Sequence, residues 1–373
     1  MNYKEYTFSE LATIKYGKNQ KKVVSDSGSI PIYGTGGLMG YAKEALYSKP
    51  SVLIGRKGTI EKVRYVTRPF WTVDTLFYTI INEEIIRPRY LYYLFLTIDL
   101  KKYNEGTTIP SLRTETLNRI KFFVPSLDVQ DRALSILGAL DDKIELNQRI
   151  NENLEQQAQA LFKSWFVDFE PFGNQLPKTW INGILGNFVN IKRGSSPRPI
   201  QNFLSDSGLH WLKISDATST ISPFINEIKE CIIKNGLKKT VFLKAGSLVL
   251  SNSATPGLPK ILDIDACIHD GWLYFPSSRF SNEYLYLYFK HIRDNLILLG
   301  NGSVFTNLKI DILKNYPTYL PTDEVLNEFN KIVKTIFSMI LSKTRESKRL
   351  SEIRDNLLPR LMSGNLNVSD FAL

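Results

Sequence analysis

The chain is poor in the residues and segments that define several classes of protein. It has only two cysteines, Cys231 and Cys267, too few for a disulfide framework or a cysteine-rich zinc site. No apolar run approaches the roughly 20 residues that a membrane-spanning helix needs. Residues 1–10 are polar and charged, without the apolar region of a signal peptide. We therefore expect a cytoplasmic protein that does not contact a membrane.

Three nucleotide-handling motifs are also missing. The chain has no Asn/Asp-Pro-Pro-aromatic tetrapeptide of the kind that holds a flipped adenine, and no Gly-x-x-x-x-Gly-Lys-Ser/Thr phosphate loop. It has no convincing dinucleotide fingerprint either. Base methylation and ATP hydrolysis would therefore have to be carried out by other chains.

What the chain does contain is nearly the same sequence twice, about 196 residues apart. The aromatic run YLYYLF at residues 90–95 returns as YLYLYF at 284–289, and residues 106–112 return as 302–308. This period is much longer than the roughly 20–50 residues of a solenoid repeat. A chain of 373 residues also exceeds the about 250–300 residues that one core usually organises. The sequence therefore predicts a domain duplication.

The start of the repeat needs a different shift. The pattern Ile-Lys-x-Gly at residues 14–17 matches residues 191–194 at a shift of 177. From this smaller shift we expect fewer loop residues near the beginning of the second copy. Further along, Asp74 falls on Asp270 at the shift of 196.

Two long helices are expected, one after each copy. Apolar residues recur at heptad spacing from Leu137 to Trp165 and again from Val333 to Leu361. Ser126 and Thr322 stand where N-caps belong, Pro171 should end the first helix, and Pro359 should kink or end the second. Each helix should have about 35 residues.

Polar residues interrupt both heptad series near the middle. If the helices pair antiparallel, Asn147 and Asn151 should meet Lys343 and Ser347 and fix the register. Packing of each helix on its own domain remains an alternative. The predicted domains are 1–125 and 171–321 for the globular copies, 126–170 and 322–366 for the helices, and 367–373 for a tail.

Positive charge lies on the globular copies. The net charge of +10 divides into +8 for residues 1–125, −5 for 126–170, +6 for 171–321 and +1 for 322–373. A polyanion such as double-stranded DNA would be drawn to the two copies by phosphate neutralisation. A merely basic protein is the alternative that charge alone leaves open.

The globular copies are predicted to be mixed α and β, with strands at 51–54, 75–81, 247–250 and 271–275. Between the strands lie loops rich in Gly, Ser and Thr, with added Arg and Lys, which let a backbone approach phosphates. Any β-rich domain also uses such loops to turn corners. The candidate DNA-binding residues are Thr35, Arg56, Lys57, Thr59, Thr107, Thr108, Arg113, Arg193, Ser195, Arg198, Lys213, Asn252, Thr255, Ser303 and Asn307.

A magnesium-dependent nuclease is the rival from another class. Asp216, Glu227 and Lys229 loosely fit the acidic and Glu-x-Lys spacing that holds Mg²⁺ in many restriction nucleases. Chance produces such a spacing in a chain rich in acids and lysines, and the first copy has no counterpart. Cys267, His269 and Asp270 could suggest a metal site or a nucleophile with its base. We favour a structural role for them, because the first copy has Trp71, Val73 and Asp74 at the equivalent positions.

The chain resembles a known family along its whole length. Residues 140–171, LDDKIELNQRINENLEQQAQALFKSWFVDFEP, resemble the central helical region of type I restriction-modification specificity subunits. LLPRLMSGNL at 357–366 resembles the end of their second helical region. VLIGRKGTI at 52–60 and CIHDGWLYF at 267–275 resemble parts of their target recognition domains.

This resemblance implies an α+β fold with two pseudo-symmetric recognition domains, each followed by a long helix, the helices pairing as an antiparallel coiled coil. It implies a subunit without catalysis, cofactor or metal of its own, which reads a bipartite DNA site. Two methyltransferase subunits that use S-adenosylmethionine, and two restriction subunits that use ATP and Mg²⁺, would be its partners. A related system with a fused methyltransferase-nuclease chain is the runner-up. By analogy the methyltransferase dock would include Leu161, Phe162, Trp165 and Phe166.

Overall fold

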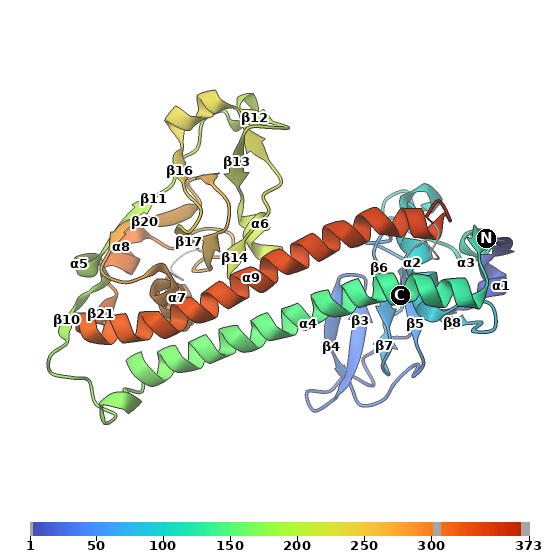
Figure 1. The fold of residues 1–373 in the computed structure, drawn as a ribbon, viewed down its shortest axis with the longest axis horizontal. Helices are drawn as coiled ribbons and strands as arrows, with labels where there is room; N and C mark the ends of the chain where they lie inside the picture. Colours follow the sequence, from blue (N-terminus) through green and yellow to red (C-terminus); the bar gives the residue numbers. More distant parts are fainter. Residues whose placement is uncertain (1–2, 301–306, 367–373) are drawn as a thin grey trace. The chain divides into compact units, whose positions relative to one another are not determined.

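The duplication in the sequence is also a duplication of structure (Figure 1). The computed structural model describes residues 3–300 and 307–366. Its contacts divide the chain into two units, Met1–Lys143 with Arg349–Leu373, and Ile144–Lys348. Each long helix begins in one unit and ends in the other. The predicted tail, residues 367–373, lies outside the described residues.

Unit 1 holds the first copy in three small sheets. Their strand orders are β1-β9, β2-β8-β5-β6 and β4-β3-β7. The elements are β1 (Lys4–Thr7), α1 (Phe8–Leu11), β2 (Ala12–Tyr16), β3 (Ile30–Gly34), β4 (Gly37–Ala42), β5 (Ser51–Gly55), β6 (Val63–Val66), β7 (Trp71–Thr72), β8 (Leu76–Ile81), α2 (Pro88–Leu96), η1 (Leu100–Tyr103), α3 (Thr114–Asn118) and β9 (Lys121–Val124).

Unit 2 holds the second copy, again in three sheets. Their strand orders are β10-β21, β11-β20-β17-β18-β14 and β12-β15-β13-β19-β16. The elements are η2 (Glu170–Phe172), β10 (Ile181–Ile184), α5 (Leu185–Phe188), β11 (Val189–Arg193), η3 (Ile200–Asn202), β12 (Leu204–Ser205), β13 (Leu209–Leu212), α6 (Ile214–Thr218), β14 (Phe224–Ile225), β15 (Cys231–Ile232), η4 (Lys234–Lys239), β16 (Val241–Leu243), β17 (Leu248–Ser251), β18 (Pro259–Leu262), β19 (Ala266–Ile268), β20 (Trp272–Ser278), α7 (Asn282–Gly300), α8 (Ile310–Lys314) and β21 (Pro317–Leu320).

The same strands form the centre of each copy. The order β2-β8-β5-β6 in unit 1 corresponds to β11-β20-β17-β18 in unit 2. All residues of β5 and of β17 are buried, and a short apolar run is typical of a strand covered on both faces. The four predicted strands are confirmed as β5, β8, β17 and β20, and the mixed α/β class is confirmed with them.

The segment from β11 to β17 in the second copy is longer than the segment from β2 to β5 in the first. The excess is the difference between the shifts of 196 and 177. The expectation of fewer loop residues near its beginning is therefore wrong. Most of the added residues lie between β13 and β15 and include α6 and β14, whereas β15 pairs with β13 as β4 pairs with β3. They place β14 parallel to β18 at the edge of the sheet β11-β20-β17-β18-β14, where the corresponding sheet of the first copy ends with β6. The second copy therefore covers surfaces that the first leaves open.

The two long helices are α4 (Leu127–Phe166) and α9 (Asp323–Met362), of 40 residues each. Ser126 and Thr322 immediately precede them, and the carbonyls of both accept hydrogen bonds from the first turn of the helix. α4 ends before Pro171. Pro359 does not end α9, which continues to Met362.

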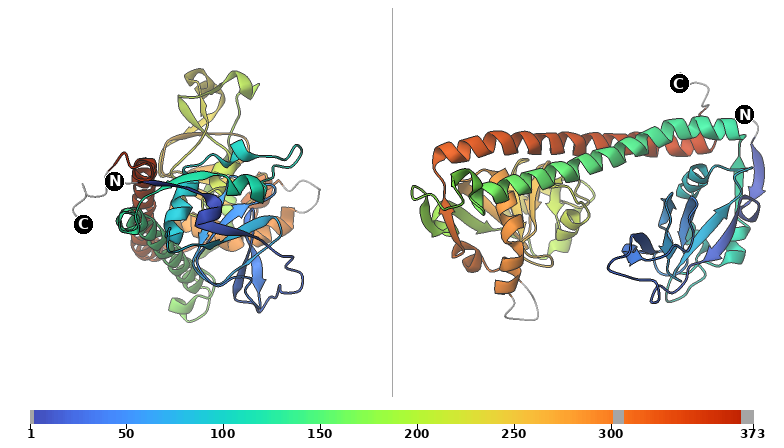
Figure 2. Two further views of the ribbon diagram at one scale, coloured as in Figure 1. Left: turned by 90° about the vertical axis from the view of Figure 1, so that its right-hand side faces the viewer. Right: turned by 90° about the horizontal axis from the view of Figure 1, so that it is seen from below.

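Within each unit the two helices lie side by side and run in opposite directions (Figure 2). In unit 1, Arg354 of α9 forms an ion pair with Asp141 of α4 at 2.8 Å. In unit 2, Asn151 of α4 donates a hydrogen bond to Thr344 of α9 at 3.1 Å. Thr344 is next to the predicted Lys343, which forms an ion pair with Glu346 of its own helix at 2.7 Å, and the meeting of Asn147 and Asn151 with Lys343 and Ser347 stays a prediction.

The predicted register residues occupy the interior of the helix pair in unit 2. Asn147 is fully buried, and among the described residues neither polar atom of its side chain has a hydrogen-bond partner. The Oγ atom of Ser347 is likewise buried and without a partner there. Such positions lower stability, and coiled coils commonly use them to fix register. In the described part of the chain, no helix is long and apolar enough to cross a membrane.

Candidate nucleic-acid interface

In the first copy, the loop after β5 is held by the main chain of two other loops. The amide of Arg56 donates to the carbonyl of Thr75 at 2.8 Å. The amide of Gly58 donates to the carbonyl of Pro110 at 2.9 Å, and the amide of Leu112 donates to the carbonyl of Arg56 at 2.9 Å. These bonds bring residues 56–59 and 107–112, which sequence reasoning selected separately, to one place.

The side chains of this loop form a basic edge. Arg56 donates to the carbonyl of Asp74 at 2.8 Å, and its guanidinium lies over the ring of Tyr16 at 5.2 Å. Lys57 is exposed and Thr59 is half-buried. Thr35, on the turn between β3 and β4, joins the edge, because a Cβ atom on Gly58 would lie 3.8 Å from its hydroxyl oxygen.

Three further candidates of the first copy lie on the loop beside this edge and at its end. Thr107 and Thr108 are exposed. Arg113 is also exposed, but it forms an ion pair with Glu105 at 3.1 Å. Its charge is therefore partly neutralised, which makes Arg113 a weaker candidate for a phosphate contact than Lys57.

The second copy repeats the backbone under this loop but not its side chains. Gly17 and Gly194 are equivalent: a Cβ atom on Gly17 would lie 2.0 Å from the carbonyl oxygen of Val73, and one on Gly194 would lie 2.3 Å from that of His269. Asn252 takes the place of Arg56 and donates to the carbonyl of Asp270 at 3.2 Å. Its side chain cannot reach a ligand, because Asn252 is 3% exposed. The prediction that Asn252 contacts DNA is therefore wrong, because its side chain is buried.

Cations of the second copy gather instead around Asp270. Arg193 donates to its carbonyl at 2.5 Å, and Arg198 lies 3.3 Å from its carboxylate. Ser196 donates to the same carboxylate at 2.7 Å and holds the pKa of Asp270 below its usual value. Sequence reasoning missed Ser196 and weighed Asp270 only for a metal or nucleophilic site, although the repetition of Asp74 as Asp270 was a signal for its place in this cluster.

A cavity of about 710 Å³ opens beside this cluster. Arg198, Lys213, Glu230, Trp211 and His269 contribute to its walls. Lys213 and Glu230 form an ion pair. Burial lowers the pKa of His269, so its ring is neutral at physiological pH. The arrangement offers aromatic surface, a cation at the rim and a paired carboxylate, which suit contact with polar groups on a flat ligand.

The remaining candidates of the second copy are less closely grouped. Ser195 is exposed and donates to the carbonyl of Lys239 at 3.1 Å. Thr255 is half-buried, with its carbonyl accepting from the hydroxyl of Ser251. Asn307 is exposed. Ser303 lies outside the described residues.

The residues of the nuclease alternative are not arranged as a metal site. Asp216 is 6% exposed and accepts a hydrogen bond from the amide of Lys213 at 2.9 Å, which closes the first turn of α6. Across residues 3–300 and 307–366, no three His, Cys, Asp or Glu side chains are grouped so as to hold a metal ion. Burial raises the pKa of Cys267 to about 11, so this thiol is not an activated nucleophile.

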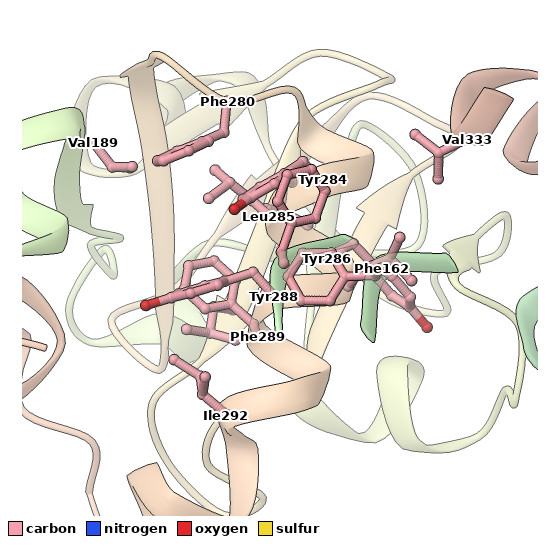
Figure 3. Packing of buried hydrophobic residues seen from close by; sticks show 14 of the residues in the cluster. Phe162, Val189, Phe280, Tyr284, Leu285, Tyr286, Tyr288, Phe289, Ile292 and Val333 are labelled. Atoms are coloured by element: carbon pink, nitrogen blue, oxygen red, sulfur yellow. The ribbon is translucent and has the colours of Figure 1, made fainter. Parts of the chain in front are cut away.

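The predicted docking residues fall into two groups. Phe162 and Phe166 are each 2% exposed. They pack against Phe329 of α9 and Tyr284 of α7, and Figure 3 shows Phe162 inside this core. They offer no free surface, so the prediction that they form part of a dock is wrong. Leu161 and Trp165 are half-buried at the edge of the same core, and for them docking stays a prediction.

Two curated relatives match most of the chain. The type I restriction enzyme MjaIX specificity subunit of Methanocaldococcus jannaschii is 26% identical over 349 residues, which cover 87% of this chain and 79% of the relative. The type I restriction enzyme HindI specificity subunit of Haemophilus influenzae is 25% identical over 366 residues, covering 76% and 79%.

A solved structure has the same fold. It is the S subunit of a type I restriction-modification system from M. genitalium, with a TM-score of 0.63 and 16% identity over 97% of this chain and 96% of that one. The profile of the family "Type I restriction modification DNA specificity domain" matches residues 1–156 and 177–354. Proteins of this kind are the specificity components of restriction-modification systems and not their catalytic ones. The chain belongs to the family of type I restriction-modification DNA specificity domains.

Proposed function

We propose that this chain is the DNA-reading subunit of a type I restriction-modification enzyme and that it recognises a DNA site in two halves. Residues 1–125 would read one half and residues 171–321 the other. The observation that carries the proposal is the repeated framework. The strands β5 and β17 lead into equivalent loops, and Gly17 and Gly194 fit against equivalent carbonyls.

The charge of each copy supports the same proposal. The net charge is +8 for residues 1–125 and +6 for residues 171–321. Cationic side chains attract phosphates, whereas base edges are read by a few loop side chains. Two basic domains with one backbone framework and different loop residues are therefore suited to two different half-sites.

The helical segments 126–170 and 322–366 would hold the assembly together. The partners in this proposal are double-stranded DNA, two methyltransferase subunits and two restriction subunits. S-adenosylmethionine, ATP and Mg²⁺ would be used by those partners, and the complex would act on DNA in the cytoplasm. A related system that combines methylation and cleavage in one partner chain is the second candidate, since this chain's role would be the same there.

Exchange of one recognition domain tests the proposal. Replacing residues 1–125 by the first domain of another family member, in a host that carries the methyltransferase, should change one half of the methylated motif. Methylome sequencing reads both halves at once. If both halves change, or if neither does, the assignment of one domain to each half is wrong.

The helices provide a second test. Insertion of four residues into α4 alone would shift its distal part by about 6 Å and slip its register against α9, so activity should fall. A matched insertion into both helices should restore pairing and lengthen the unread spacer by roughly one or two base pairs. An active complex with an unchanged spacer would show that the helices do not set this distance.

A further inference from the structure

The hairpin of β3 and β4 exposes apolar side chains in unit 1. Leu38 is 52% exposed and Met39 is 59% exposed. Both belong to β4, which is the edge strand of its sheet. Large apolar side chains that are exposed on an open edge strand are candidates for contact with a ligand or a partner.

Cations surround this hairpin. A Cβ atom on Gly37 would lie 3.4 Å from Nη2 of Arg64, and Thr35, on the turn, reaches the loop that carries Lys57. Neither Arg64 nor Lys57 forms an ion pair with any residue in the described part of the chain. Arg64 therefore lies beside the hairpin that carries Leu38 and Met39, and the loop that carries Lys57 approaches the turn of that hairpin.

Duplex DNA matches such a surface in one way. Its phosphates complement the cations, and the apolar group that it presents in the major groove is the 5-methyl group of thymine. Resting on the proposed function, we propose that Leu38 and Met39 contact thymine methyl groups in the half-site read by the first domain. Lys57 and Arg64 neutralise phosphates on either side.

The charge of the domain separates this occupant from a second copy of the chain. An open strand edge can pair with another strand. A second copy would bring its own Lys57 and Arg64 to the same edge, and residues 1–125 carry a net charge of +8. Like charges placed opposite one another oppose this pairing, whereas phosphates favour DNA at the same place.

Replacement of thymine by uracil removes only the methyl group and so tests the contact directly. After methylome sequencing has given the motif, the full chain is bound to duplexes in which each thymine of the first half-site is replaced in turn. At one or two positions uracil should weaken binding about four-fold, the effect of one buried methyl group.

The double substitution Leu38→Ala with Met39→Ala completes the test. This variant should bind the thymine and uracil duplexes equally, because the side chains that sense the methyl group are gone. Phe123→Ala is the matched control: Phe123 is also exposed, at 58%, on β9 of the same unit. The control should keep the four-fold preference. Thermal unfolding and light scattering establish that the variants are folded and have the parent's oligomeric state.

The outcomes are separable. If the parent chain binds its motif but shows no preference for thymine in the first half, the contact does not exist. A preference that survives the double substitution also overturns the inference, and so does an assembly that dissociates on substitution, since the face would then be a protein interface. If the parent chain binds no specific duplex at all, the proposed function itself fails.

Discussion

The same position of the repeat holds Arg64 in unit 1 and Lys260 in unit 2, and the two side chains have opposite environments. Arg64 is half-buried beside the β3–β4 hairpin and has no anionic partner among the described residues. Lys260 is 3% exposed, and its ammonium group donates to the carbonyl oxygens of Thr220 at 2.8 Å and Ser222 at 2.5 Å.

The residues added to the second copy explain this difference. Thr220 and Ser222 belong to the segment between β11 and β17 that is longer in the second copy. Their carbonyl groups contact Lys260 of β18 and enclose its ammonium group. In the first copy this segment is shorter, and the equivalent Arg64 remains accessible. The repeated strands therefore fix the backbone position of a side chain, and the inserted segments decide whether that side chain is accessible to a ligand.

The shared framework should be the most sensitive part of both copies. Gly17→Ala and Gly194→Ala each place a Cβ atom against a carbonyl oxygen that belongs to the main chain, so neighbouring backbone must move. We expect each to lower the free energy of unfolding by about 3 kcal/mol or more, measured by denaturant titration. Gly36→Ala is the control, because a Cβ atom there has nothing within 4 Å. Unequal losses at the two glycines would break the equivalence of the copies.

The buried lysine should make the stability of unit 2 depend on pH. Burial lowers the pKa of Lys260 to about 8 from its usual value of 10.5. Between these two values the unfolded chain binds more protons than the folded one, so stability should rise with pH, by up to about 3 kcal/mol in total. Unfolding monitored from pH 7.5 to pH 10.5 checks this.

The control for that experiment is the equivalent position. Lys260→Met should remove the rise with pH relative to the parent, although it also leaves two carbonyl groups without their donor. Arg64→Met should keep the rise. Parallel curves for the parent and Lys260→Met would show that the lysine is not the titrating group.

Equivalent polar residues of the two long helices should also differ in their effect on stability. Asn147 and Lys343 are equivalent in the repeat, but Asn147 is buried without a partner whereas Lys343 reaches Glu346. Asn147→Leu should raise the free energy of unfolding by about 1–3 kcal/mol, since it removes an unsatisfied amide. Lys343→Leu should change it less. A loss of stability in Asn147→Leu would mean that the amide has a partner in solution.

The smallest effect is expected on DNA binding. Lys57→Ala should remove one phosphate contact and lower the slope of log affinity against log salt by roughly one. Arg56→Ala should act similarly, although its side chain also supports the carbonyl of Asp74. Asn252→Ala, at the position equivalent to Arg56, should leave the slope unchanged because Asn252 is buried. Equal slopes in all three variants would place the first loop away from DNA.

The sequence by itself determined the repeat, the long helices and most of the central strands. Heptad spacing and short apolar runs depend on neighbours along the chain, so residues 51–54 and 247–250 could be identified as strands without the structure. The family resemblance, carried by residues 140–171, is confirmed by the family profile. It too could be identified from the sequence, because it depends only on the order of residues.

Only the tertiary structure decided which of the selected side chains are accessible. Phe162, Phe166 and Asn252 are ordinary candidates in the sequence and buried residues in the fold. Arg64 and Lys260 stand at one position of the repeat, yet only Lys260 is enclosed. Burial depends on segments that are distant along the chain, such as residues 220–222 above β18, and a pattern of neighbouring residues carries no information about such contacts.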